Sequence, residues 1–271
     1  MLTVLNFVYG QEVKVNFISQ EDQTAIPFVN VWFGNSEKGF ISDENGQVNY
    51  DFTSVDKESK MIVDMIGYEL YQVKVADFLK SNHTISLVPD VIELEEVTFY
   101  DKKKFKEKNV GPDSKSKSVF FNIITNGSDE EDNLKEVAVY INSGKKRAKV
   151  LRINMNFAKY EHDFELPYRL VLYANNDGQP GEILNKKDII GHFSKDKIVD
   201  QVFTINLEKH DLWIKGSFFI SFQVLNNEYK KPINLSASMM HKSFLRSTYE
   251  QWQKLPMGLS PAINADLLIE K

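Results

Sequence analysis

Residues 11–100 alternate between apolar and polar positions with a period of two. In the segment VKVNFIS, Val13, Val15 and Phe17 fall on one face and the polar residues between them fall on the other. This period is typical of a β-strand that is buried on one side. Glycines at the intervening turns are spaced as in a β-sandwich of short strands. The pattern therefore predicts an all-β domain over residues 11–100.

Residues 119–271 show the same alternation. The predicted strands include KEVAVYIN, KVLRINMNF, YRLVLYA, DQVFTINL and GSFFISFQVL. Roughly eight strands in a region of this length suit a jelly-roll-like sandwich. Because no segment has sustained helical periodicity, we expect an all-β chain with two β-sandwich domains.

The stretch DKKKFKEKNVGPDSKSKS, residues 101–118, lies between the two regions. It is rich in lysine, contains Gly-Pro and has almost no apolar residues, which predicts an exposed linker. A cationic run of this kind could also bind an acidic partner or a lipid surface.

The first ten residues are apolar through Tyr9, and Val8 and Gly10 have the small-residue spacing of a signal-peptidase site. A basic segment before them is missing and the apolar core is short. Two interpretations stay open: residues 1–10 are the remnant of a secretory signal peptide, or they form a first β-strand.

The composition of the chain excludes several classes of function. The net charge of -5 argues against general nucleic-acid binding, which needs a basic surface. The absence of cysteine excludes disulfides, thiolate metal sites and a cysteine nucleophile. No apolar run reaches the roughly 18–20 residues of a membrane-spanning helix.

The loop SDENG, residues 42–46, carries two carboxylates and an amide, which could either bind calcium or form a tight turn. In a turn, the Asp43 side chain accepts a hydrogen bond from the backbone two residues on, and Gly46 adopts a positive φ. We expect the turn. The loop YANNDGQPGEIL offers weak calcium candidates in Asn175, Asp177 and Glu182, although these residue types also suit a turn.

Trp252 is the strongest candidate for contact with a ligand or partner, together with Tyr249, because both lie in the polar segment STYEQWQKLPMG. Trp32 and Trp213 fall in or beside predicted strands, where we expect them to be buried or half-buried. No GxSxG elbow and no phosphate-binding glycine loop occurs. We therefore expect no catalytic residues and no cofactor.

The first domain resembles the carboxypeptidase regulatory-like (transthyretin-like) module of Bacteroidota envelope proteins. The matching segments are AIPFVNVWFGNSEKGFISDENGQV, MIGYELYQVKV and ISLVPDVIELEEVTFY. This resemblance implies a seven-stranded Greek-key sandwich without catalytic activity.

The remaining chain is similar to the C-terminal part of Bacteroidota proteins that carry the same module. The segments concerned are LPYRLVLYANNDGQPGEIL, GSFFISFQVL and FLRSTYEQWQKLPMGLSPAINADLLIE. The resemblance of the first domain, the secretory-looking N-terminus and the absence of catalytic motifs together indicate a non-enzymatic binding or assembly module of the cell envelope, periplasmic or at the cell surface. The expected partner is an envelope protein, with an outer-membrane β-barrel complex as the candidate. The alternative is a protein that binds carbohydrate through its C-terminal domain.

Overall fold

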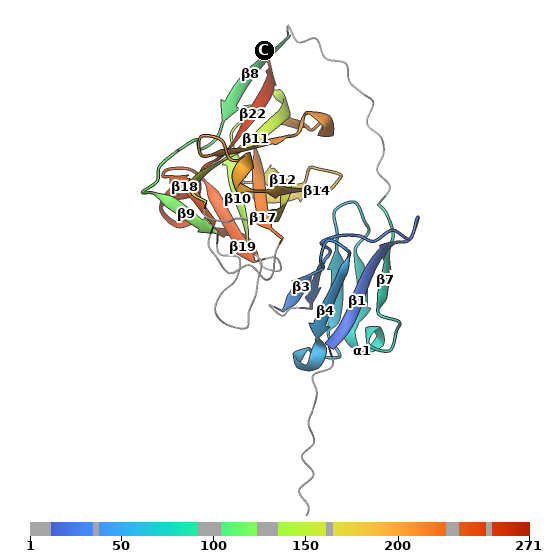
Figure 1. Cartoon of the computed structure of the whole chain (residues 1–271). Coiled ribbons are helices and arrows are strands. Elements are labelled where there is room, and N and C mark those ends of the chain that lie inside the picture. The colour runs from blue at the N-terminus through green and yellow to red at the C-terminus, as the bar shows by residue number, and fades with distance from the viewer. Residues whose placement is uncertain are drawn as a thin grey trace, which may run out of the picture. The chain divides into compact units, whose positions relative to one another are not determined.

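The computed structural model describes residues 12–34, 38–90, 104–123, 135–160, 165–225, 233–247 and 251–271. The chain divides into two compact units, residues 1–91 and 92–271, and both are built almost entirely of strands (Figure 1). The all-β class with two β-sandwiches is therefore confirmed. Residues 1–10 and 91–100 lie outside the described residues, so neither interpretation of the N-terminus is tested.

In unit 1 the described strands form two sheets that enclose one core. The predicted alternation is confirmed in β1, where Val13, Val15 and Phe17 are buried. Strand β1 pairs antiparallel with β4 and parallel with β7. The first sheet has the order β4 (Gln47–Asp51), β1 (Glu12–Ser19), β7 (Thr84–Leu87), and the second β3 (Gly39–Ile41), β2 (Asn30–Phe33), β5 (Lys60–Asp64), β6 (Tyr71–Lys74). Two short helical segments complete the unit, η1 (Phe52–Ser54) and α1 (Val75–Phe78).

Unit 2 is a larger sandwich of two sheets, here called sheet I and sheet II. Sheet I contains β13 (Gln179–Ile183), β12 (Leu166–Asn176), β17 (Phe218–Val224), β10 (Lys135–Ile141), β19 (Ser243–Ser247) and β20 (Gln253–Lys254) in that order, with β14 (Ile189–Phe193) on β12. Sheet II contains β21 (Ser260–Pro261), β18 (Ile233–Ser238), β11 (Arg147–Lys159), β22 (Ile263–Glu270) and β8 (Phe105–Val110) in that order, with β15 (Val202–Asn206) and β16 (Trp213–Lys215) on β11 and β9 (Phe120–Ile123) on β18. The helical turns are η3 (Lys195–Lys197), η4 (Glu208–His210) and η5 (Pro256–Gly258).

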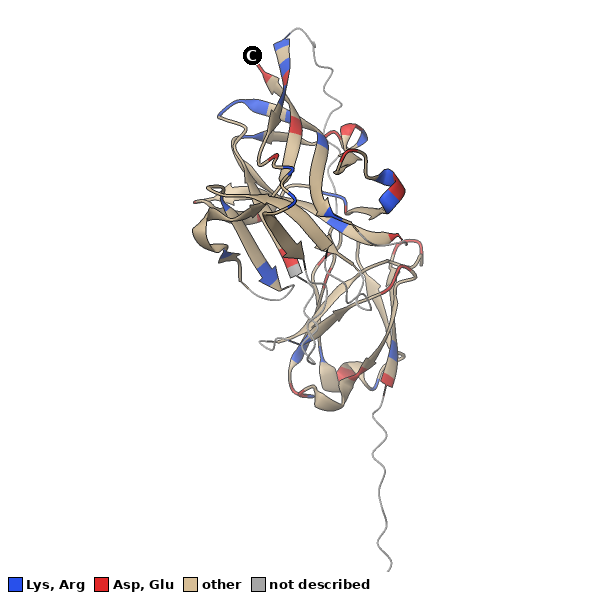
Figure 2. Ribbon diagram, turned by 60° about the vertical axis from the view of Figure 1, so that its left-hand side comes forward, with Lys and Arg blue, Asp and Glu red and all other residues tan. Residues whose placement is uncertain are grey.

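The core of unit 2 lies between the inner faces of these sheets. Strand β10 contributes Val137, Val139 and Ile141, and β17 contributes Phe218, Ile220 and Phe222. All seven residues of β17 are buried, so the outer face of this central strand is covered as well. Figure 2 shows the charged residues mainly in loops and toward strand ends. No helix among the described residues is long and apolar enough to cross a membrane.

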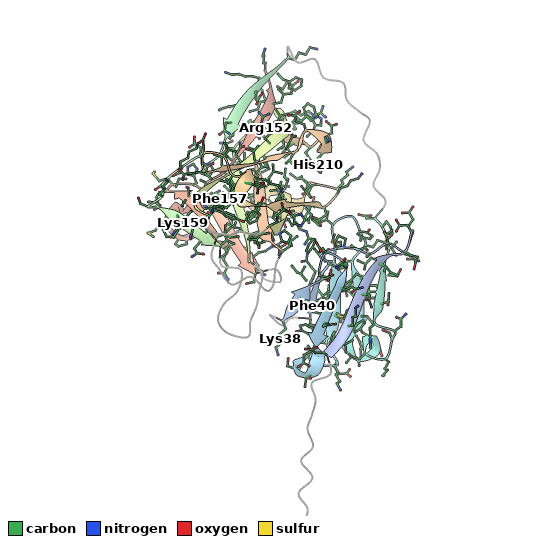
Figure 3. All side chains as sticks on the ribbon, viewed as in Figure 1. Lys38, Phe40, Arg152, Phe157, Lys159 and His210 are labelled. Atoms are coloured by element: carbon green, nitrogen blue, oxygen red, sulfur yellow. The ribbon has the colours of Figure 1, made fainter. Side chains whose placement is uncertain are left out.

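Strand β11 organises sheet II. It is 13 residues long, and Arg152, Phe157 and Lys159 mark positions along it in Figure 3. It pairs with β22 along much of its length and with β15, β16 and β18 over shorter stretches. A single strand therefore aligns four others.

The linker predicted for residues 101–118 is wrong for residues 105–110, which form β8 and pair with all but the first two residues of β22. An edge strand needs backbone partners more than apolar side chains, so its lysines stay exposed while it completes the sheet. Phe105 also packs against Trp213, with ring centroids 5.6 Å apart.

The loop at residues 42–46 is the expected turn. The Asp43 Oδ1 atom accepts hydrogen bonds from the backbone N–H of Asn45, at 2.9 Å, and of Gln47, at 2.7 Å. Gly46 has a φ of 69°. A Cβ at Gly46 would lie only 2.7 Å from the carbonyl oxygen of Ile26 and 2.9 Å from that of Phe17. Both parts of the predicted turn are confirmed.

We predict that Gly46→Ala destabilises unit 1 by more than about 3 kcal/mol, since it adds a backbone clash to the cost of a left-handed φ. Urea unfolding of the full chain would measure this. Gly34→Ala is the matched control, because Gly34 also has a positive φ, of 54°, but a Cβ there would meet only ordinary contacts. Equal losses in the two variants would contradict the prediction.

Candidate functional site

The outer face of sheet I carries a group of polar and aromatic side chains to which Trp252 belongs. We call Glu136, Tyr173, Ser221, Arg246 and Trp252 the Trp252 cluster. Strand register brings its members together: Glu136 lies opposite Arg246 on the neighbouring strand, and Ala138, two residues on, lies opposite Ser221. Because alternate residues of a strand face opposite sides, Val137, Val139 and Ile141 point into the core while the Glu136 carboxylate points outward.

Glu136 is the centre of the cluster and is only 4% exposed. Its Oε1 accepts hydrogen bonds from the Tyr173 hydroxyl, at 2.9 Å, and from the Ser221 hydroxyl. Its Oε2 accepts one from the Arg246 Nε at 2.7 Å. Strands β12, β17 and β19 thus each supply a donor to one buried carboxylate on β10, as buried charges require.

Arg246 and Tyr173 hold the indole of Trp252. The Arg246 Nη2 donates to the Tyr173 hydroxyl at 2.8 Å, and its guanidinium lies 4.2 Å from the centre of a Trp252 ring. The Tyr173 ring meets Trp252 edge to face, at 5.5 Å and 79°. Trp252 remains half-buried. Its orientation is therefore set by a cation–π contact with Arg246 and an aromatic contact with Tyr173. Both of these residues are in turn hydrogen-bonded to the buried Glu136.

The electrostatics of the cluster favour binding over acid–base chemistry. Burial raises the pKa of Tyr173 well above its ordinary value of 10, and the negative charge of Glu136 adds to this. The phenol therefore keeps its proton at neutral pH and donates it to the carboxylate. Glu136 and Arg246 neutralise each other, so the cluster presents a fixed aromatic surface.

A second ion pair stiffens the same sheet. Arg169 on β12 and Asp188 form a two-pronged contact, with Nε 2.9 Å from Oδ1 and Nη2 2.8 Å from Oδ2. Arg169 is only 2% exposed. A bidentate pair fixes orientation as well as charge. It joins β12 to the segment that leads into β14.

On the outer face of sheet II, a network joins β8, β22 and β11. The Asp266 carboxylate accepts hydrogen bonds from Arg152 Nε at 2.9 Å, from Asn109 at 2.8 Å and from Asn154 at 3.3 Å. Burial works to raise the pKa of Asp266, but these hydrogen bonds outweigh it and the net pKa is lowered. This network stabilises the edge strand that composition alone suggested was a linker.

The weak calcium candidates lie in the β12–β13 hairpin. Asp177 and Gly178 form its two-residue loop with φ values of 48° and 88°, as in a type I′ turn. The Asn175 Oδ1 accepts from the Gly178 N–H, and its Nδ2 donates to Ser217, both at 2.8 Å. Glu182 is exposed on β13. The hairpin accounts for these residue types, and calcium binding here stays a prediction.

Within the described part of the chain, no group of three or more His, Cys, Asp or Glu side chains is placed to hold a metal ion. Tyr249 lies outside the described residues.

Trp32 and Trp213 are half-buried, as expected, and Trp213 stacks under Arg147 at 4.2 Å.

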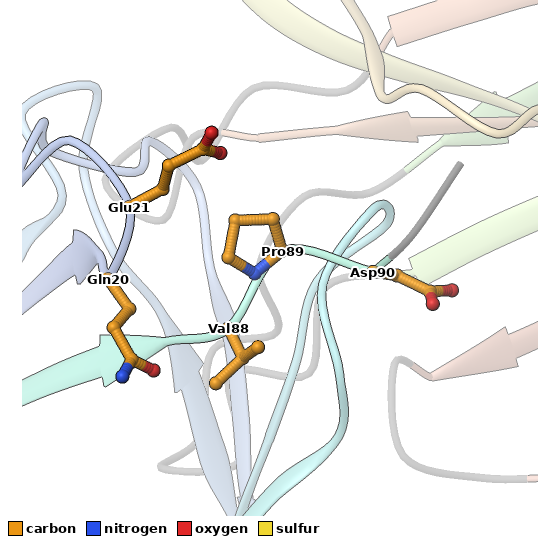
Figure 4. A pocket seen from close by; sticks show the side chains of 5 residues that line it. All are labelled: Gln20, Glu21, Val88, Pro89 and Asp90. Carbon is orange, nitrogen blue, oxygen red and sulfur yellow. The ribbon is translucent and has the colours of Figure 1, made fainter. Parts of the chain in front are cut away.

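Unit 1 has a shallow cleft at the end of β7 (Figure 4). It is lined by Gln20, Glu21, Val88, Pro89 and Asp90. The backbone around it is held by hydrogen bonds, for example from Gln20 N–H to the Leu87 carbonyl at 2.8 Å. None of the predicted contact residues lies there.

Comparison with known proteins assigns the first domain. Residues 16–99 match the family described as the CarboxypepD_reg-like domain. The chain thus carries a carboxypeptidase regulatory-like domain, as the sequence resemblance predicted. No curated protein matches the chain.

Among solved structures, one that the chain is similar to is titled "Structure of infectious bursal disease virus Gt strain". The identity is 8% and the TM-score 0.21, over 91% of this chain and 63% of the viral chain. The chain therefore spans less than two thirds of the length of that viral chain. A similarity this low carries no argument about function.

We predict that the free energy of unfolding falls less steeply above pH 10 in Tyr173→Phe than in the wild type. The folded pKa is raised, so above pH 10 the unfolded chain releases this proton while the folded protein keeps it. The stabilisation is complete below pH 10 and falls by up to about 1.4 kcal/mol per pH unit above it. Urea unfolding from pH 8 to 11 should show the wild type approaching the variant. Tyr168 is also a buried tyrosine, with a pKa raised to about 12, so Tyr168→Phe should show the same smaller loss of stability above pH 10. Parallel curves would contradict the prediction.

We also predict that Arg246→Met costs about 3–5 kcal/mol, because it leaves the buried Glu136 without its cationic partner. Adding Glu136→Gln should restore at least about 1 kcal/mol, since the buried charge is then gone. Urea unfolding at pH 7 of both single variants and the double variant tests this. If the losses of the two single variants add up in the double variant, Glu136 and Arg246 are not energetically coupled and the prediction is wrong.

Proposed function

We propose that this chain is a non-enzymatic binding module whose second sandwich contacts its partner through Trp252. The observation that carries this proposal is the fixed, half-exposed indole held by Arg246, Tyr173 and the buried Glu136. Trp, Tyr and Arg are the residue types that dominate binding energy at protein interfaces. An anchor fixed before binding loses little conformational entropy on association.

The non-enzymatic character is supported by how the charged groups of the cluster are used. Glu136, Arg246 and the Tyr173 hydroxyl bond to one another, so none is poised to transfer a proton to a substrate. The carboxypeptidase regulatory-like domain at residues 16–99 agrees with this role, since the family resemblance implies a sandwich without catalytic activity.

We further propose that the module works in the bacterial cell envelope, in the periplasm or at the cell surface. There it would serve as an accessory subunit of an outer-membrane protein complex. The support is the resemblance of both regions to envelope proteins of Bacteroidota and the apolar N-terminal residues with signal-peptidase spacing.

We predict that Trp252→Ala weakens capture of the envelope partner at least about tenfold, as loss of a buried aromatic anchor would. The measurement is a pull-down from envelope extract, quantified against immobilised wild-type chain. Trp213→Ala is the matched control, because Trp213 is also half-buried beneath an arginine but lies on sheet II. Recovery of no partner by the wild type, or equal loss in both variants, would contradict the proposal.

Carbohydrate binding by the second sandwich is the other candidate, and the half-exposed indole favours it because aromatic faces can pack against sugar rings. A glycan array probed with the same proteins separates the two. Signals lost in Trp252→Ala and kept in Trp213→Ala would support carbohydrate binding. If the wild-type protein binds no glycan on the array, the carbohydrate-binding proposal is wrong.

A further inference from the structure

Exposed apolar side chains gather at one end of unit 2. We call the group Val119, Phe120, Met239, Met240 and Met257 the methionine tip. Met240 is 94% exposed and Met257 is 80% exposed. Val119, Phe120 and Met239 are each between 44% and 48% exposed. Among the described residues, these are five of the nine large apolar side chains that are exposed.

Three chain segments come together to form this tip. Strand β9 lies beside β18, with Phe120 opposite Ser236 (Figure 1). The Val119 carbonyl accepts a hydrogen bond from Ala237 N–H at 2.9 Å, just before Met239. The loops of Met240 and Met257 are joined where His241 N–H donates to the Gly258 carbonyl at 3.0 Å. The three segments that carry these exposed side chains therefore lie close together.

The two most exposed methionines share an unusual backbone conformation. Met240 and Met257 both have left-handed backbone conformations, with φ values of 68° and 53°. This region is unfavourable for residues other than glycine. Gly258 packs so closely on the Met240 backbone that a Cβ there would lie 3.0 Å from the Met240 Cα atom. The joined loops thus hold two strained turns, and the methionine in each is exposed to solvent.

The segments of the tip are basic, although the chain has a net charge of -5. Residues 113–120, 239–242 and 253–258 contain four lysines and one acidic residue, Asp113. The lysines are Lys115, Lys117, Lys242 and Lys254, and His241 is exposed next to Met240. Lys242 lies over the Tyr140 ring, 5.2 Å from its centre, and Lys115, Lys117 and Lys254 are exposed. The excess of basic residues in these segments complements an anionic surface.

We propose that the methionine tip inserts into the surface of an anionic lipid bilayer. Apolar side chains with basic neighbours enter the boundary between headgroups and acyl chains, where lysines meet anionic headgroups. A side chain that is 94% exposed makes almost no contact with its neighbours, so it can enter acyl chains without breaking contacts within the protein. A bilayer needs no matched surface, whereas a protein partner does. This inference goes beyond the binding proposed for Trp252 and does not depend on it.

Vesicle flotation of the full chain tests the proposal. We expect the wild type to float with vesicles of phosphatidylcholine mixed with phosphatidylglycerol, and less with phosphatidylcholine alone. The double variant Met240→Asp, Met257→Asp should partition at least about tenfold more weakly. The matched control is Leu70→Asp, Val88→Asp, which adds the same charge at exposed apolar positions in unit 1 and should keep wild-type partitioning.

A second measurement does not rely on loss of binding. The chain has no cysteine, so Met240→Cys provides one thiol for a polarity-sensitive fluorophore. Its emission should shift to shorter wavelength on mixed vesicles, and the same label at Leu70→Cys should not shift. Trp252→Ala should still float, which separates this proposal from the previous one.

Three outcomes would overturn the proposal. The first is a wild type that stays unbound in the presence of mixed vesicles. The second is equal flotation of the tip variant and the control. The third is loss of a protein partner in the tip variant while vesicles remain unbound by every form, which would assign the tip to a protein interface.

Discussion

The second sandwich depends on the backbone pairing of β11. This strand is long enough to be hydrogen-bonded along both edges, so it sets the direction and register of four neighbours at once. Its inward residues, among them Val150, Ile153 and Met155, are completely buried. A slip of one residue would turn this apolar set outward and would also separate Arg152 from Asp266. Core packing and the polar network therefore enforce the same register.

The outer face of sheet I shows how polar burial can position a surface residue. Removing a carboxylate from water is costly unless its oxygens are bonded, and Glu136 meets this need with donors from three neighbouring strands. The arginine that pairs with it also stacks on Trp252. The orientation of the indole is thus tied to the register of β10, β12, β17 and β19. The strands of sheet I thus position the two side chains that contact the indole.

Much of the fold could be predicted from the sequence because period-two alternation and turn chemistry are local. The burial of Val13, Val15 and Phe17 and the turn closed by Asp43 and Gly46 followed from neighbouring residues. Strand β8 could not be recognised, since its stability comes from backbone bonds to a distant strand. Trp252 was recognisable by its polar surroundings, but its partners Glu136 and Arg246 were not. They meet only through strand register, and a charged residue inside an apolar strand was their one signal in the sequence.

The position of β22 has a consequence for how the protein reaches its native state. This strand is the last of its unit and yet lies between β11 and β8, and the bond from Asn109 to Asp266 closes a separation of 157 residues. During synthesis, β8 has no sheet to join and β11 keeps an open edge until residues 263–270 have left the ribosome. Non-local pairing of this kind slows folding and leaves strand edges open to aggregation. Sheet II is therefore completed only once β22 has been synthesised, and until then the edges of β8 and β11 that it will cover are exposed.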